Sequence, residues 1–126
     1  MDNEPSTKMR MDPSYIAALD LVAVHPGGVR VPVSLRVGAP KRVSRGEWSC
    51  AVRLDGLHDG LTTTRGEDSV QALCLALGLA ATLLRDFVSR GGRLVHAEAT
   101  EDGGSESDWP LEAYFRGLAM PESPAT

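Results

Sequence analysis

The chain has few of the residues that mark the specialised classes of protein. Among 126 residues there are two cysteines and three histidines, and aromatic residues make up 5%. Cys50 and Cys74 each lie within an apolar pattern, which predicts two reduced, buried thiols. A disulfide between them is the alternative if the helix packs directly over the Cys50 strand and brings the two Cα atoms within about 7 Å. No cysteine and histidine residues have the spacing of a zinc site, and no nucleotide-binding or nucleophile motif occurs. We therefore expect no cofactor, no metal and no catalytic residues.

Positive charge and long apolar runs are also scarce. The net charge is −4, so a global attraction to nucleic acid or anionic lipid is not expected. The longest apolar run has about 15 residues, short of the ~20 that span a bilayer, and residues 1–13 lack the apolar core of a signal peptide. These absences predict a cytoplasmic protein with no membrane partner. Basic residues are mostly arginine, and alanine, glycine and valine abound, as in bacteria with GC-rich genomes.

The length predicts one domain. Residues 1–13 and 121–126 are polar and rich in proline, so we expect a disordered N-terminal extension and a disordered tail. The domain itself is expected over 14–120. Within it, 100–108 is acidic and rich in glycine and serine, which predicts a flexible loop.

Apolar and polar residues alternate in two long segments, 29–37 and 47–55, as in half-buried antiparallel strands. Shorter strands are expected at 19–25, 61–64 and 93–97. Since Pro32 cannot donate to a strand ladder, the segment that contains it should lie at an edge or direct that position outward.

The remaining segments complete the expected fold. Residues 38–46 are interpreted as a basic loop, and 109–118 as a short helix with Asp108 as its cap and Pro110 in its first turn. The predicted fold class is α+β: an antiparallel meander of three to four strands, with one long helix on one face and a short C-terminal helix.

The long helix is predicted over 68–90. Asp68 is a good N-cap, and Gln71 three residues later makes a variant of the capping box. Gly91 and Gly92 then supply the left-handed stop. At 1.5 Å per residue this helix is roughly 34 Å long.

Two apolar stripes run along this helix. The first should cover the sheet and comprises Val70, Leu73, Cys74, Leu77, Ala81, Leu84 and Val88. The second comprises Leu75, Ala76, Leu79, Ala80 and Leu83. An apolar patch of this extent is rarely left exposed on a monomer. Either a second copy of the chain covers the second stripe, in a homodimer, or the C-terminal segment with Trp109, Tyr114 and Phe115 does.

Two polar groups are further candidates. Arg30, Arg36 and Arg53 are expected on the outer face of the sheet, where they form a basic face that suits nucleic acid. That face lacks aromatic residues for base stacking, so a solvated sheet face is the simpler interpretation. Asp55, His58 and Asp59 lie in a glycine-bounded turn and have suitable groups for a metal or acid–base site. Aspartate is also favoured in hairpin turns for backbone reasons.

The core of the sequence resembles a family of small uncharacterised bacterial proteins. The resemblance lies in Glu47-Trp48-Ser49-Cys50, then Gly56-Leu57, then a stretch from Gly66 to Leu73 that opens the helix with Gly-x-Asp-Ser-x-Gln-Ala-Leu. It covers roughly 18–97. The resemblance implies no activity, cofactor or catalytic residue.

Taken together, these patterns favour a non-enzymatic interaction protein that binds itself, as a homodimer, or another protein. An immunity or antitoxin-like protein is one version, because acidic residues would suit a basic partner. The alternatives are a nucleic-acid-binding module that uses the basic face, and a small enzyme or metal-binding protein with its site near Asp55, His58 and Asp59.

Overall fold

A computed structural model describes residues 15–97 and 107–118 of the chain. Its elements in chain order are the strands and helices β1 (Tyr15–Val24), β2 (Arg30–Gly38), β3 (Lys41–Ser44), β4 (Glu47–Asp55), β5 (Leu61–Gly66), α1 (Ser69–Ser89), β6 (Arg93–His96) and α2 (Leu111–Phe115). The predicted α+β class is confirmed, since the described residues form an open antiparallel sheet, one long helix and a short C-terminal helix. The expected number of strands is too low, because this sheet has six strands where three to four are predicted.

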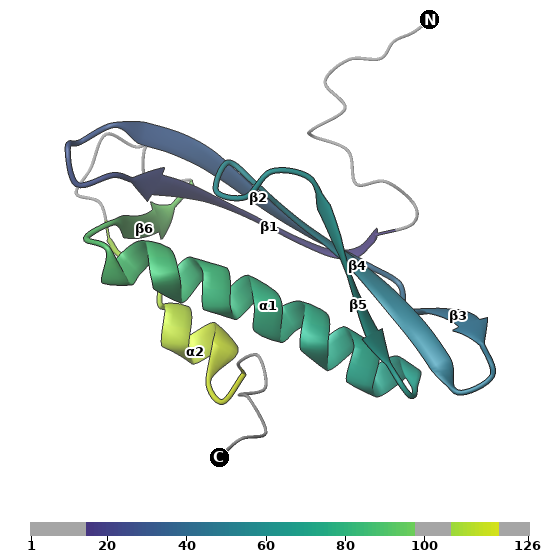
Figure 1. Cartoon of the computed structure of the whole chain (residues 1–126). Coiled ribbons are helices and arrows are strands. Elements are labelled where there is room, and N and C mark those ends of the chain that lie inside the picture. The colour runs from purple at the N-terminus through teal and green to yellow at the C-terminus, as the bar shows by residue number, and fades with distance from the viewer. Residues whose placement is uncertain (1–14, 98–106, 119–126) are drawn as a thin grey trace, which may run out of the picture.

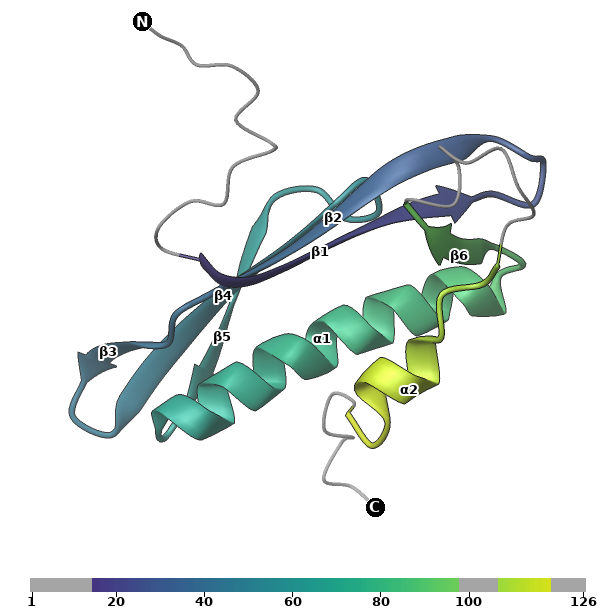
Figure 2. The same cartoon turned by 180° about the vertical axis from the view of Figure 1, so that it is seen from behind.

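The six strands form one sheet with α1 along one face (Figures 1 and 2). β4 is paired with β5 on one side. On its other side β4 is paired with β3 along its first residues and with β2 along its last. β1 follows β2, and β6 pairs with the C-terminal half of β1. The β3–β4 hairpin and β6 therefore lie at opposite ends of the molecule.

The sequence predicts β4 with its observed bounds, because its alternation is unbroken over 47–55. The expected loop 38–46 is wrong in part, since Lys41–Ser44 is a strand that pairs with β4. β1 begins at Tyr15, four residues before the expected start. Pro32 lies in β2 beyond the end of the β4 pairing, which stops at Ser34, so it occupies a local edge within a central strand.

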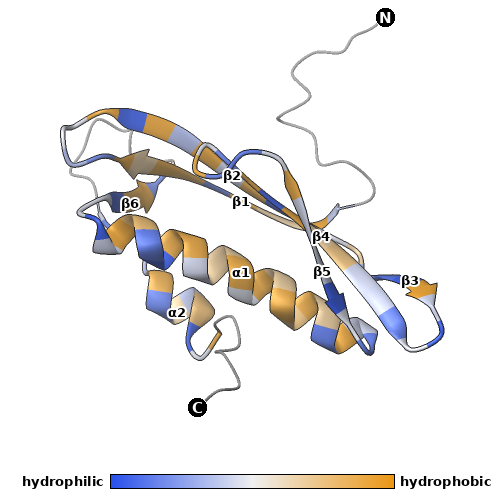
Figure 3. Cartoon of the chain, in the orientation of Figure 1, coloured by the Kyte–Doolittle hydropathy of each residue, from blue (hydrophilic) through white to orange (hydrophobic). Residues whose placement is uncertain are grey.

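The core lies between the sheet and the helices. Cross-strand partners place Leu35 beside Leu54 and Val37 beside Val52 on the inner face, and all four are buried. Because residues of one strand face alternate sides, only every second residue contributes to this core. Figure 3 shows apolar residues along nearly the whole of α1, which lies against that face.

The predicted caps of α1 are confirmed. The Asp68 carboxylate accepts a hydrogen bond from the backbone N–H of Gln71 at 2.7 Å, and the Gln71 side chain accepts one from the N–H of Glu67 at 2.6 Å. The helix ends before Gly91, whose φ of 99° is a left-handed conformation. α1 also approaches β5 closely: a Cβ on Gly66 would lie 2.5 Å from the backbone nitrogen of Ala72.

The assignment of helix faces is wrong in part, since only Ala81 and Leu84 of the first stripe are fully buried in the core. Ala72, Ala76 and Ala80 are fully buried and belong to the core, whereas Val70 is 68% exposed. Cys74 and Val88 are also exposed. Small residues at a spacing of four allow the helix axis to come close to the sheet, and leucines flank that line of contact. The residues predicted to form an interface on the second stripe therefore make contacts inside this chain. Ala76 and Ala80 lie in the core, Leu79 and Leu83 pack against it, and Leu75 is half-buried.

The C-terminal segment packs on the core, but it is not what faces the second stripe: Leu79, Ala80 and Leu83 line a small cavity together with Val52 and Leu54 of β4. Trp109 is 3% exposed and Phe115 is 6% exposed, and α2 lies against the C-terminal half of α1 (Figure 2). Tyr114 remains exposed at 56%. Pro110 occupies the N-cap position without a side-chain cap, so the predicted cap at Asp108 is wrong.

Arg85 of α1 forms hydrogen bonds and an ion pair with α2 and the residues that follow it. Arg85 makes a two-pronged ion pair with Glu112, at 2.8 and 2.9 Å. Its guanidinium also donates to the backbone carbonyls of Phe115, at 2.7 Å, and Leu118. The last carbonyls of a helix lack partners within the helix, so Arg85 satisfies groups at the end of α2 while it holds the segment in place.

Other sequence predictions lie wholly or partly outside the described residues. These are the disordered segments 1–13 and 121–126 and most of the acidic loop 100–108. Asp108, at the end of that loop, is described and forms an ion pair with Arg93 at 2.8 Å. α1 is long and apolar enough to cross a membrane, a test that the core helix of a soluble protein also meets.

Candidate interaction surface

The outer face of the sheet, opposite α1, carries its polar side chains in cross-strand rows. One row consists of Lys41, Ser49 and Arg65. Arg36 and Arg53 are partners in another row. The row between them has small side chains, because Ala51 is paired with Thr63. Two rows with cations therefore flank a row of small residues.

The strand ladder opens beside the small residues. β2 leaves β4 after the pair Val37 and Val52, and β3 joins it at the pair Lys41 and Ser49. Three residues of one chain segment therefore stand opposite two residues of β4, and the third of them, Pro40, has no N–H to donate. The segment arches away from β4, and this arch leaves a hollow in the outer face.

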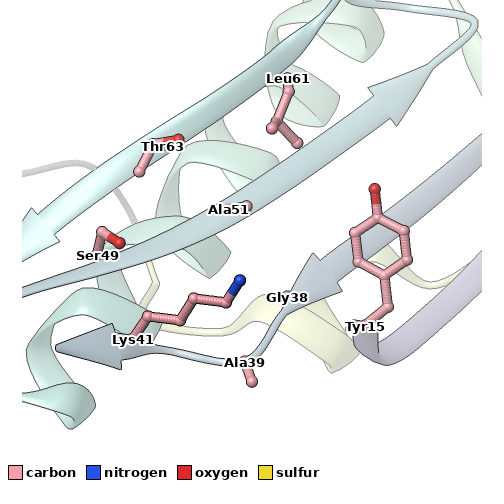
Figure 4. Close-up of a pocket in the computed structure, with 8 residues that line it drawn as sticks. All are labelled: Tyr15, Gly38, Ala39, Lys41, Ser49, Ala51, Leu61 and Thr63. Atoms are coloured by element: carbon pink, nitrogen blue, oxygen red, sulfur yellow. The ribbon is translucent and has the colours of Figure 1, made fainter. Parts of the chain in front are cut away.

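The hollow has a volume of ≈ 270 Å³. Figure 4 shows Ala51 at its floor, with Tyr15 and Lys41 on opposite sides and Leu61 and Thr63 along β5. The complete lining is Tyr15, Gly38, Ala39, Lys41, Ser49, Ala51, Leu61 and Thr63. Ligand pockets for drug-sized molecules span roughly 300–1,000 Å³, so this hollow suits a single side chain or a short segment.

The lining of the hollow contains a positive charge and no negative charge. Its polar side chains are one ammonium and three hydroxyls, and no carboxylate contributes to it. Beside the hollow, Asp55 and a hydrogen bond to Tyr15 raise the pKa of Arg53. Arg53 also contacts Asp55 at 3.3 Å, and Arg65 is paired with Glu47. Within the part of the chain that the structure describes, no ion pair involves Lys41.

The predicted basic face is largely neutralised. Arg36 and Arg53 lie side by side on the outer face, as expected, but Arg36 is paired with Asp20 at 3.2 Å and its side chain is only 12% exposed. Arg30 lies at the start of β2 and is exposed. From the sequence, Lys41 is expected only as a member of the basic loop 38–46, and Tyr15 is missed altogether, although Gly38 and Pro40 in that loop signal a break in the strand.

The turn with Asp55, His58 and Asp59 is exposed. Asp55 is engaged by Arg53, and His58 Nε2 lies 3.4 Å from the Thr62 hydroxyl. In the described ranges no group of three or more histidine, cysteine, aspartate or glutamate side chains is arranged to hold a metal ion. The turn thus gives no geometric support to the enzyme or metal hypothesis.

The two thiols differ. Cys50 is buried, donates to the Gly38 carbonyl at 3.2 Å, and has its pKa raised by burial. Cys74 is exposed on α1, so the prediction of two buried thiols is wrong for it. Both are free, and neither faces the hollow.

A second surface lies at the edge of β1. β6 pairs only with Leu21–Val24, so the preceding residues Ile16–Asp20 have β2 on one side. On the other side no strand among residues 15–97 and 107–118 pairs with them. Ile16 is 51% exposed, and Ala17 and Ala18 are exposed as well. Unpaired N–H and C=O groups on an apolar edge are a template for another strand.

Comparison with known proteins gives a family and no activity. Neither a curated protein nor a solved structure matches the chain significantly. The family model described as a domain of unknown function, DUF6968, matches residues 22–106. This match spans two thirds of the sequence, from β1 through α1 and β6. The chain therefore belongs to the DUF6968 family, in agreement with the resemblance to an uncharacterised family.

Proposed function

We propose that this protein is a non-enzymatic interaction domain that works as a cytoplasmic homodimer, joined through the free edge of β1. The observation that carries the proposal is that Ile16–Asp20 of β1, within the described residues, have a partner strand on the β2 side alone. The side chains of this segment are apolar until Asp20, so before that residue the edge carries none of the charged residues that oppose strand addition.

The β1 edge suits a second copy of itself. In an antiparallel pair about a two-fold axis at Ala18, Ala17 of each copy stands opposite Leu19 of the other, and the two Ala18 residues face each other. The small alanines allow the two backbones to meet without a steric barrier. Such an interface is isologous, as is most common in homodimers.

The edge of β5 is less suitable. β5 also has a strand on one side only within the described residues, but it consists largely of threonine and ends with Arg65 and Gly66. Short edges with charged residues are protected against strand addition. The edge of β1 has no charge before Asp20, so it is the stronger candidate.

Sedimentation equilibrium of the full chain at tens of micromolar tests the proposal. We expect a mass of twice 13.4 kDa and a dissociation constant in the micromolar range, as befits a small interface. Ile16→Lys should raise that constant at least tenfold, because an edge lysine opposes strand addition.

Val29→Lys is the matched control, since Val29 is 64% exposed and lies next to the β1–β2 turn, away from Ile16–Asp20. It should leave the dimer unchanged. A wild-type monomer over the whole range, or equal dimerisation of the two variants, would contradict the proposal.

A further inference from the structure

We infer that the hollow on the outer sheet face receives the carboxylate side chain of an acidic segment of a partner protein. The inference rests on the proposed role as an interaction domain and adds the chemistry of its partner. The hollow lies on the outer face and is open to solvent, whereas the proposed dimer contact follows the edge of β1.

The polar groups of the lining all offer donors. The Lys41 side chain extends from β3 toward Gly38, as Figure 4 shows, and an ammonium has three donors and no acceptor. The Tyr15 hydroxyl helps to raise the pKa of Arg53, and because a guanidinium only donates, that hydroxyl keeps its own hydrogen to donate. Ser49 and Thr63 supply two further hydroxyls. A ligand that accepts several hydrogen bonds and carries negative charge complements this set.

The charge balance favours a carboxylate over a phosphate. Arg36, Arg53 and Arg65 around the hollow are each engaged by a carboxylate of this chain, so Lys41 is the cation left to face a ligand. One cation balances one carboxylate, whereas phosphate is typically bound by a planar arginine fork or by several cations. Leu61, Ala39 and Ala51 offer apolar contact to the aliphatic stem of a glutamate or aspartate.

The hollow is built into the fold and does not depend on one flexible side chain. Its floor exists because β2 and β3 leave a gap beside Ala51, and the paired strands on both sides of the gap fix the positions of Ser49 and Thr63. The Cys50 thiol donates to the Gly38 carbonyl beneath the arch. A preformed site loses less conformational entropy on binding.

Titration of the isotope-labelled full chain with an acetylated, amidated glutamate-rich hexapeptide, followed by amide NMR shifts, tests the inference. We expect saturable shifts around Tyr15, Lys41, Ala51 and Thr63. Lys41→Met should weaken binding about tenfold, the effect of one charge-assisted hydrogen bond. Arg45→Met removes the same charge from the exposed β3–β4 turn and should leave the affinity unchanged.

Three outcomes would overturn the inference: shifts that are absent or spread over the whole surface, equal binding of the matching glutamine peptide, or tighter binding of a single-stranded oligonucleotide to the same residues. The last would favour nucleic acid instead. The mass of the Lys41→Met variant separates this inference from the proposed function, because the β1 dimer should persist in that variant whether or not the peptide binds.

Discussion

The two halves of β1 have similar sequences and different surroundings. In the C-terminal half, Leu21 and Ala23 are 3% and 0% exposed, because β2 and β6 flank the strand and the helices cover its inner face. In the N-terminal half, Ile16 and Ala17 are exposed although they are equally apolar. The comparison teaches that burial in this sheet depends on neighbouring elements, and that in the described part of the chain one half of β1 has a strand on one side only.

The largest expected effect comes from truncating a side chain in each half. Leu21→Ala should lower the free energy of unfolding by about 2–5 kcal/mol, because it leaves a cavity in the core. Ile16→Ala should change it by less than about 0.5 kcal/mol when measured at a concentration that keeps the chain monomeric. Denaturant unfolding checks both. A comparable loss in the two variants would show that Ile16 is buried within the single chain.

A smaller effect concerns α2, one of the elements that cover the C-terminal half of β1. The hydrogen bonds and charge of Arg85 hold the pKa of Glu112 below its ordinary value of 4.5. A carboxyl with a lowered folded-state pKa stabilises the fold above its unfolded value, and that contribution is lost as the pH falls through the folded value. We therefore expect α2 to loosen at acidic pH below 4.5, as a change in Trp109 fluorescence in a Trp48→Phe background.

Arg85→Gln provides the matched control for this transition. It removes the charge while it retains a side chain that can donate to the carbonyls of Phe115 and Leu118. The acidic transition of Trp109 should then disappear, and α2 should be partly loosened at neutral pH. An unchanged transition in Arg85→Gln would assign it to another carboxyl group.

Much of this fold could be predicted from local patterns. β4 has strict alternation, and α1 has its own start at Asp68 and Gln71 and its own stop at Gly91, so neighbouring elements do not alter their bounds. The face of α1 that contacts the sheet could not be predicted, because both stripes are apolar. The choice depends on the close approach of α1 to β5 at Gly66, which favours alanine over leucine at the contact.

The candidate site was harder to predict than the fold. The hollow arises where β2 and β3 share one side of β4, and this arrangement brings Tyr15 and Lys41 to Ala51 from distant parts of the sequence. The three arginines of the predicted basic face lie on the outer face of the sheet, as expected, but Asp20 and Asp55 lie on that face as well. Since pairing across strands depends on register, the sequence alone did not show that the charges of Arg36 and Arg53 are neutralised.

Amide hydrogen exchange at Ile16–Asp20, compared at tens of micromolar and after dilution below the dimer dissociation constant, tests the central claim most directly. Successive amides of a strand point to opposite edges, so a second copy should protect those that face away from β2. We predict protection at high concentration and rapid exchange of the same amides on dilution, with Leu21–Val24 protected in both. Rapid exchange of the outward amides at both concentrations would contradict the account.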